Sequence, residues 1–388
     1  MTTAILSPRA LNRATLARQL LLERSDLSAV SAIERLAGLQ AQAPDASYVG
    51  LWSRLRDFQT DGLAKPLAAR EVVRSTLMRG TVHLVTAEDG LALWPTIKPV
   101  VERGFRGHYS REIAGLDLGE VADAGRALLA EGPRTRVELR AALAARWPGI
   151  DPATLGYALG GLLPLAHVTP RGLWGQTGPA AYSLLEDWVG ARITDGIPLD
   201  DLVVRYLAAF GPATVRDAQV WSGLTRLKEV FERLRPRLRT FTDGVGKELF
   251  DLPDAPRPDA ETPAPPRFLP EYDNVLLSHA DRVRVIPDGR RVPLPPGNGG
   301  RRGTLLVDGE FLAVWAIKGA TLTIESREPL RDQDSIAEEG GTVAGIRGAG
   351  AEPRRTFRYR RITVRPFAVT KGGVRAKQGR EEPEGSGP

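Results

Sequence analysis

The spacing of hydrophobic residues along this chain changes between a helical period and a strand-like period. The same order of these two periods occurs three times. Two segments with helical spacing of hydrophobic residues are followed each time by strand-like alternation. Helices followed by a hairpin are typical of a winged-helix unit. The pattern therefore predicts an α+β protein with three tandem winged-helix units, at residues 1–118, 119–194 and 195–252.

In the first unit, helical segments at 11–22 and 31–39 precede the segment 69–78 and a strand-like run at 79–85. Thr86 is the expected N-cap of the next helix, because a threonine oxygen accepts hydrogen bonds from the free N–H groups of a first helical turn. A further helix is therefore expected to begin directly after Thr86.

Further helices are predicted in the second and third units. Asp151 is an expected N-cap, and Pro152 suits the first helical position because its missing N–H would have no partner there. The helical segments of these two units are 134–147, 153–163, 199–211, 213–224 and 224–234.

Turn-forming residues mark the hairpins of the same two units. Pro170, Arg171 and Gly172 interrupt strand-like pieces and predict a wing turn with Arg171 at its tip, within reach of a DNA phosphate. In the third unit, Asp243-Gly244 is a hairpin signal.

A proline-rich stretch at 253–267 follows, with too few apolar residues to pack, and it predicts a semi-rigid linker. Residues 268–375 beyond it are strand-rich and predict a small β domain. Its hairpin turns are expected at Asp308-Gly309 and Lys318-Gly319. The basic stretch 287–303 is expected to be a mobile loop, and the tail 376–388 has the composition of disorder.

The composition fits a globular, nucleic-acid-binding protein but does not prove one. The chain has 388 residues, no cysteine, 42% hydrophobic residues and 53 basic against 47 acidic side chains. Of the basic residues 46 are arginines, which bind phosphate in two-point contacts, although GC-rich codon usage explains the same excess equally well. Lacking a signal core and an apolar span of membrane length, the chain is expected to be cytoplasmic.

The usual signatures of nucleotide and metal enzymes are absent from the sequence. It contains no phosphate-binding loop, no strand–GxGxxG–helix unit and no HExxH motif. The histidines are scattered singly, so each is more often a packed or surface residue than a metal ligand: His83, His108, His167 and His279. We therefore expect neither a metal nor a cofactor.

Gln40-Ala41-Gln42 is the feature with most chemical interest. Because Pro44 disfavours helical geometry at Ala43, the helix at 31–39 is expected to end near Gln40 and the chain to continue extended. Residues i and i+2 of an extended chain share one face, so both amides can point at the same place.

Two neutral carboxamides cannot act as a strong base, but they can orient a water molecule. That is sufficient when the leaving group is already activated, as in an N7-alkylated purine. Alternatively, the motif is only a polar helix end, because eight glutamines produce a Gln-x-Gln by chance about 0.2 times in this length.

The run 79–84 places Arg79, Thr81 and His83 on one strand face. These three either satisfy one another and the neighbouring backbone or contact DNA near the glutamine pair.

Four stretches together resemble the winged-helix DNA glycosylases of the AlkZ type: LNRATLARQLLL, LAGLQAQAPDASYVGLWSRL, LMRGTVHLV and FLPEYDNVLLSHADR. The resemblance covers nearly the whole chain. It implies three tandem winged helices with a concave DNA-binding surface and a C-terminal β-barrel-like domain. The family motif of Gln, an apolar residue, then Gln or Asp maps onto Gln40, Ala41 and Gln42, and Asn274 in the last stretch is expected to contact DNA.

By this resemblance, Gln40 and Gln42 are catalytic and position water for hydrolysis of the N-glycosidic bond, without a metal. The expected substrate is double-stranded DNA with bulky N7-alkylpurines, including interstrand crosslinks, and the expected role is resistance to a genotoxic metabolite. The linker, the 287–303 insert and the small Ala41 depart from the family pattern. With only 6% aromatic residues, the chain is expected to reach the sugar without enclosing the base in a stacking pocket.

Two other classes of function remain open at this stage. One is a winged-helix regulator or damage sensor without chemistry; such proteins usually dimerise, whereas this chain carries three units and is expected to be a monomer. The other is a protein that sequesters the drug itself, which would need an apolar cavity.

Overall fold

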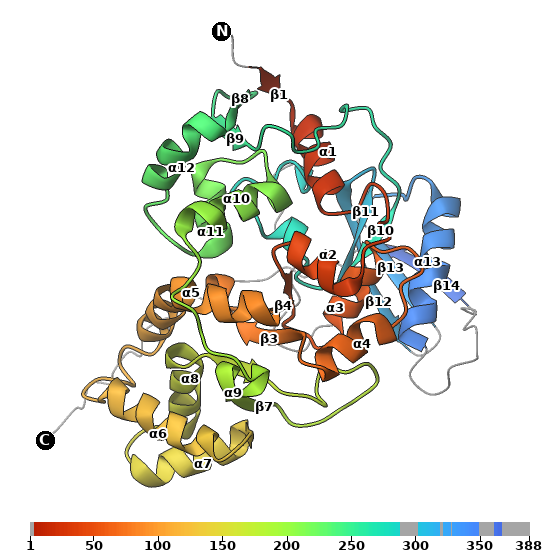
Figure 1. Cartoon of the computed structure of the whole chain (residues 1–388). Helices are drawn as coiled ribbons and strands as arrows, with labels where there is room; N and C mark the ends of the chain where they lie inside the picture. Colours follow the sequence, from red (N-terminus) through yellow and green to blue (C-terminus); the bar gives the residue numbers. More distant parts are fainter. Residues whose placement is uncertain (1–3, 288–301, 319–320, 327, 349–360, 367–388) are drawn as a thin grey trace, which may run out of the picture.

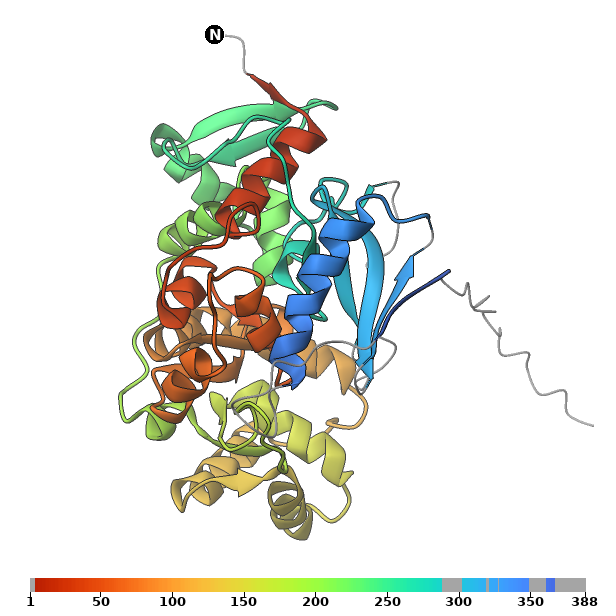
Figure 2. The same ribbon diagram turned by 90° about the vertical axis from the view of Figure 1, so that its right-hand side faces the viewer.

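The computed structural model describes residues 4–287, 302–318, 321–326, 328–348 and 361–366. Short helices and hairpins form most of this part, and a five-stranded sheet with a long helix lies against one side of them (Figures 1 and 2). The predicted loop at 287–303 lies almost wholly outside the described residues, and the predicted tail at 376–388 lies entirely outside them. None of the helices described is both long and apolar enough to cross a membrane.

The first part of the chain forms short helices and a hairpin. Ser7 and Ser28 cap the first two helices with their hydroxyl oxygens. Thr86 accepts the N–H of Asp89, which confirms the predicted cap of a 22-residue helix. The elements are α1 (Pro8–Arg18), α2 (Ala29–Arg35), β2 (Leu39–Gln40), α3 (Ala46–Trp52), α4 (Asp61–Ala68), β3 (Val72–Thr76), β4 (Val82–Thr86) and α5 (Ala87–His108).

The second part again places a hairpin after helices. The Asp151 carboxylate accepts the N–H of Thr154 and Pro152 is the first helical residue, as predicted. The elements are α6 (Leu118–Ala130), β5 (Arg134–Thr135), α7 (Arg136–Arg146), α8 (Pro152–Leu162), β6 (Leu165–His167), β7 (Ala181–Leu184) and α9 (Leu185–Val189).

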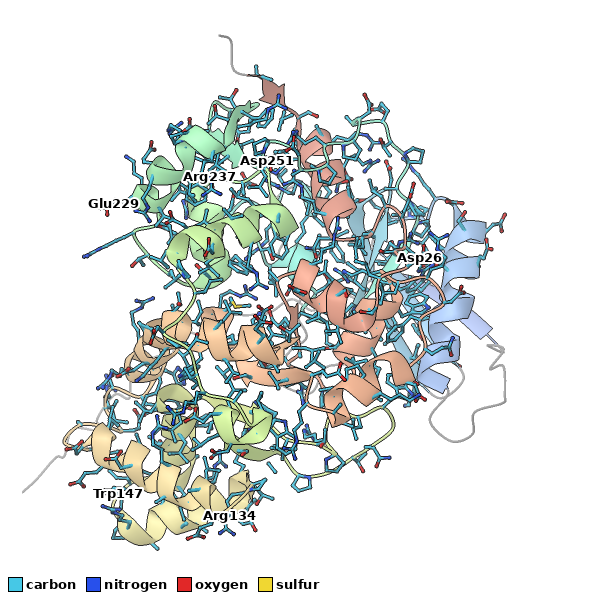
Figure 3. All side chains as sticks on the ribbon, in the orientation of Figure 1. Asp26, Arg134, Trp147, Glu229, Arg237 and Asp251 are labelled. Atoms are coloured by element: carbon cyan, nitrogen blue, oxygen red, sulfur yellow. The ribbon has the colours of Figure 1, made fainter. Side chains whose placement is uncertain are left out.

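The third part has the same order and ends in the hairpin predicted at Asp243-Gly244. Its helix α11 begins with a capping box, in which Thr214 and Asp217 satisfy each other's backbone N–H groups. The elements are α10 (Leu199–Phe210), α11 (Val215–Ser222), α12 (Lys228–Leu234), β8 (Arg239–Asp243) and β9 (Glu248–Asp251). Figure 3 places Glu229 and Arg237 of this part far from Arg134 and Trp147 of the second part.

Strand pairing joins the three parts more closely than the predicted boundaries suggest. One six-stranded sheet has the order β2-β4-β3-β6-β7-β5 and crosses the expected boundary at residues 118–119 through the pair Ser75 and Ala166. The short strand β1 (Ile5–Leu6) runs parallel to β8, so the beginning of the chain belongs with the third hairpin.

The predicted C-terminal barrel is wrong for the described residues, which form an open sheet of order β10-β11-β12-β13-β14. A helix that the sequence analysis missed lies on one face (Figure 2), where Ile336 joins Phe268, Leu322 and Trp315 in a buried cluster. The elements are β10 (Arg267–Leu269), η3 (Asn274–Leu276), β11 (Gly303–Val307), β12 (Glu310–Lys318), β13 (Thr321–Ser326), α13 (Gln333–Gly348) and β14 (Arg361–Pro366).

The turns of this sheet are partly as predicted. Asp308-Gly309 forms a two-residue turn between β11 and β12, with φ of 49° and 81°. Lys318 and Thr321 pair across the next reversal, whose residues 319–320 lie outside the described chain.

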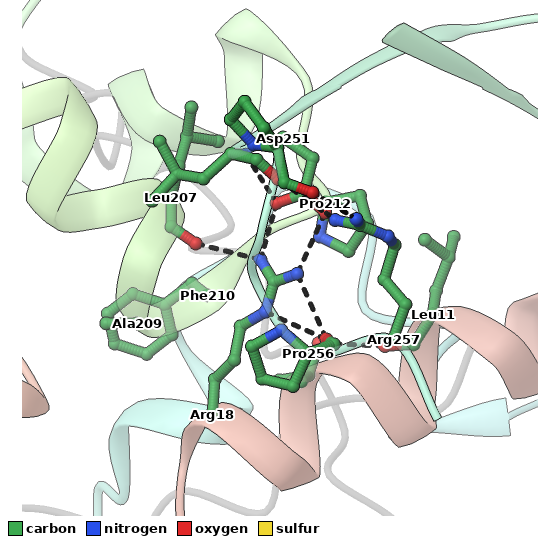
Figure 4. Close-up of polar contacts among 12 residues, drawn as sticks. Leu11, Arg18, Leu207, Ala209, Phe210, Pro212, Asp251, Pro256 and Arg257 are labelled. Carbon is green, nitrogen blue, oxygen red and sulfur yellow. Dashed lines mark hydrogen bonds and ion pairs between the residues drawn. The ribbon is translucent and has the colours of Figure 1, made fainter. Parts of the chain in front are cut away.

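The proline-rich stretch has neither helix nor strand until β10 begins at its last residue, Arg267, but it packs, contrary to the prediction. The carbonyl oxygens of Pro256 and Thr262 accept hydrogen bonds from Arg18 and Arg13 of α1. Arg18 also forms a fully buried two-point ion pair with Asp251 at 2.7 and 2.8 Å (Figure 4). Arginine donors therefore fix a segment that has too few apolar side chains to anchor itself.

Candidate active site

The chain turns sharply before Gln40. Helix α2 ends at Arg35, earlier than predicted, and Gly38 follows with a φ of 84°. A Cβ atom at Gly38 would lie 2.8 Å from Val85 Cγ1 and 3.1 Å from the carbonyl oxygen of Leu84. The close approach of β4 thus requires glycine here, and the chain enters β2 in extended form, as expected.

Gln40 is held through both its backbone and its side chain. Its N–H donates to Asn274 Oδ1 at 3.2 Å, and Asn274 Nδ2 donates to the Gly38 carbonyl oxygen at 2.7 Å. Gln40 Oε1 accepts a 2.7 Å hydrogen bond from Arg79, and the residue is only 7% exposed. Because a guanidinium only donates, the Gln40 amide turns its oxygen to Arg79 and keeps its NH2 group as a donor.

Gln42 is exposed, in contrast. Ala41 between the two glutamines is fully buried, and its N–H donates to the Val82 carbonyl oxygen at 2.8 Å. Gln42 Oε1 accepts the Val82 N–H at 3.4 Å. The Gln42 residue lines a cavity of about 420 Å³ together with Arg79. Arg79 therefore contacts one glutamine and shares a cavity with the other.

Arg79 connects the first hairpin to the third part of the chain. It lies in the turn η1 (Met78–Gly80) with a left-handed φ of 57°, so the predicted strand begins only at Val82. Its Nη1 donates to the Trp221 carbonyl oxygen at 2.8 Å. Burial, aided by the Arg282 guanidinium, lowers the pKa of Arg79 to about 10, so Arg79 stays a cation at neutral pH.

A family model described as DNA glycosylase AlkZ-like matches residues 33–347. The chain belongs to the AlkZ-like DNA glycosylase family. It is therefore a DNA N-glycosylase that acts in DNA repair, with DNA as its substrate. Among solved structures, the Streptomyces sahachiroi DNA glycosylase AlkZ has the same fold, with a TM-score of 0.73 and 20% identity, over 94% of this chain and 100% of that one. No curated protein sequence matches the chain.

In this AlkZ-like enzyme, Thr81 and His83 contact the backbone of their own hairpin. The Thr81 hydroxyl donates to the Met78 carbonyl oxygen at 3.1 Å. His83 is fully buried with Nδ1 at 2.9 Å from the Thr81 carbonyl oxygen. Burial and the Arg79 charge lower the pKa of His83 to about 3, so its ring is neutral at pH 7. These contacts favour the backbone-satisfying alternative over DNA contact.

The other two predicted DNA contacts, Arg171 and Asn274, both form hydrogen bonds to the backbone of the protein itself. Arg171 is half-buried and donates to the Gly178 carbonyl oxygen at 3.0 Å, in the segment between β6 and β7. Asn274 is 2% exposed, and both its amide oxygen and its amide nitrogen form hydrogen bonds with the backbone around Gln40. Its placement favours a positioning role over the predicted contact with DNA.

Arg74 is a site residue that the sequence analysis missed. It is 3% exposed and donates to the Ala41 carbonyl oxygen at 2.9 Å, between the two glutamines. Its Nε and Nη1 have no hydrogen-bond acceptor among the described residues, and burial lowers its pKa to about 10. A lone arginine in a strand gives no sequence signal for this contact.

The cavity walls of the second part were also missed. They come from α7, α8, β6 and β7, about a hundred residues from Gln42. One signal was present: Gly156, Gly160 and Gly161 lie within a single helix, where glycine costs stability, and such glycines indicate a need for space.

Proposed function

We propose that this enzyme hydrolyses the N-glycosidic bond of bulky N7-alkylated purines in duplex DNA. The proposal includes interstrand crosslinks as substrates, a monomeric enzyme acting on DNA in the cytoplasm, and protection of the cell from a genotoxic natural product. The observation that carries it is the arrangement of Gln42, exposed at a cavity, beside Gln40, whose amide is fixed by Arg79.

The two amides supply complementary hydrogen-bonding groups. Gln40 presents an NH2 donor because Arg79 occupies its oxygen, and Gln42 presents a carbonyl oxygen near the cavity. A water molecule held by a donor and an acceptor has a lone pair fixed in direction. We assign this water as the nucleophile.

The reaction needs no strong base when the purine is already cationic. The C1′–N9 bond breaks, its electron pair neutralises the purinium, and the sugar is left with oxocarbenium character. The water oxygen bonds to C1′ and its proton passes to solvent. Neutral amides are sufficient for this step, because the reaction requires a correctly positioned water molecule rather than the removal of a proton by a strong base.

The direct test is incubation of the purified chain with a duplex that contains one N7-methylguanine, followed by alkaline cleavage at abasic sites. The undamaged duplex is the control, and a parallel duplex with an N7–N7 crosslink tests unhooking. We expect strand cleavage at the lesion above the rate of spontaneous depurination. Binding without new abasic sites would contradict the proposal and favour a damage sensor.

A further inference from the structure

The cavity beside Gln42 extends away from the glutamine pair, between α5, α7 and α8. Its volume of about 420 Å³ lies in the range of small-molecule sites, roughly 300–1,000 Å³. Such a space is larger than the catalytic water requires. It can therefore accommodate a group from the substrate in addition to the water.

Aromatic side chains are concentrated around this cavity, although they are rare in the chain. Three of the seven tyrosines line it, and Phe105 joins them. The rings of Tyr109 and Tyr157 stack at 5.3 Å between centroids with 20° between planes, and Tyr157 is 44% exposed. The partly exposed Tyr157 ring is therefore accessible to another planar group at this cavity.

The positive charge of the cavity lining favours an uncharged part of a lesion over the cationic purine. Arg79, Arg136 and Arg140 contribute guanidinium groups, and none of the described residues that line the cavity is a carboxylate. Arg136 lies over the Tyr182 ring at 5.7 Å and Arg140 over the Tyr157 ring at 5.5 Å. An N7-alkylpurine is cationic and is repelled here, whereas a neutral aromatic group can stack beside guanidinium planes.

Glycines leave space along the wall of the cavity. A Cβ atom at Gly104 of α5 or at Gly160 of α8 would meet no atom within 4 Å, and both residues line the cavity. Side chains at these two positions would therefore occupy the space itself.

We propose that this cavity receives the uncharged, planar aromatic part of a bulky N7 adduct, while the cationic purine stays outside it at Gln42. This inference rests on the proposed function. It assigns to the cavity the selection of the N7 adducts that the enzyme accepts. The guest remains attached to the purine, so the glycosidic carbon stays near the glutamine pair.

The test fills the cavity step by step and compares two lesions. Gly160→Ala, Gly160→Leu and, on the other helix, Gly104→Leu are assayed on duplexes with N7-benzylguanine and N7-methylguanine. Gly107→Leu is the matched control, because a Cβ there also meets no atom within 4 Å but Gly107 does not line the cavity. Thermal melting of each variant checks folding.

We expect the leucine variants to lower kcat/KM for N7-benzylguanine about tenfold or more, and to leave N7-methylguanine excision within about twofold. The control should change neither. Equal loss on both lesions in folded variants would overturn the inference and place the purine itself in the cavity. Unchanged excision of both lesions would overturn it as well. Failure of the parent chain to excise N7-methylguanine would instead contradict the proposed function.

Discussion

The two sides of Gln42 are built in different ways. On one side, Gln40 is nearly buried, and Arg79 and Asn274 hold it through hydrogen bonds of 2.7 and 3.2 Å. On the other side, the cavity wall carries glycines and an exposed tyrosine, Tyr157. The first side fixes the amide of Gln40, and the second leaves space beside Gln42.

The fixed side continues into the protein through a buried ion pair. Arg54 and Asp273 meet in two contacts of 2.9 and 2.8 Å, with side-chain exposures of 0% and 1%. Asp273 directly precedes Asn274, so this ion pair anchors the residue that holds Gln40. The position of Gln40 thus depends on buried contacts inside the protein, whereas the space at the cavity depends on glycines, which have no side chain.

Removing that anchor should give the largest effect on stability. Arg54→Met leaves Asp273 buried without its partner, which typically costs about 3–5 kcal/mol in the free energy of unfolding. Urea denaturation measures the loss. Arg106→Met is the control, since its ion pair with Glu102 is solvent-exposed and should contribute less than about 1 kcal/mol. Equal effects of the two substitutions would mean that the fixed side has no special anchor.

The glutamines themselves should separate catalysis from stability. Gln42→Ala is expected to slow excision of N7-methylguanine about 10²–10³-fold under single-turnover conditions, with little change in melting temperature, because Gln42 is exposed. Gln40→Ala should slow excision similarly, but it also leaves a buried Arg79 donor unpaired and should cost about 1–3 kcal/mol. Parental excision rates in both variants would rule out the catalytic assignment.

Asn274 distinguishes positioning from DNA contact. Asn274→Ala removes the acceptor for the Gln40 N–H and the donor to Gly38, so the Gln40 backbone is free to shift. A displacement of this kind should slow excision about ten- to a hundredfold and leave the Kd for DNA unchanged. A parallel fall in affinity for DNA would restore the role in DNA contact that the sequence suggested.

Local signals explain why parts of the fold could be predicted. Thr86 and Asp151 were found as caps because a capping residue acts on N–H groups three positions away. The Asp308-Gly309 turn depends in the same way on its own two residues. Helix starts and tight turns of this kind could therefore be predicted from periodicity and turn chemistry, whereas the division into three winged-helix units stays a prediction.

Long-range contacts explain most of the errors. Helix α2 ends early for a local reason, because Ala37 and Gly38 take left-handed φ values of 54° and 84° and the Gly38 N–H donates to the Ile33 carbonyl oxygen. The proline-rich stretch packs because arginines of α1 donate to its carbonyl oxygens. Asn274 holds Gly38 across more than 230 residues of sequence. Periodicity carries no information about such partners. For the candidate site, residue types and the family pattern are enough to propose Gln40 and Gln42, whereas Arg74 and the cavity walls could be added only from the structure.

The smallest expected effect concerns two adjacent glycines of α8, where the cavity meets the packed interior. A Cβ at Gly161 would lie 2.7 Å from Phe105 Cβ, whereas a Cβ at Gly160 would meet nothing within 4 Å. Gly161→Ala should therefore destabilise the protein by about 1–3 kcal/mol through overpacking. Gly160→Ala should stabilise it by about 0.5–1 kcal/mol, because alanine restricts the unfolded chain and favours the helix. If the urea midpoints of both variants moved in the same direction, Gly161 would not be on a packed face of α8 while Gly160 is on an open one.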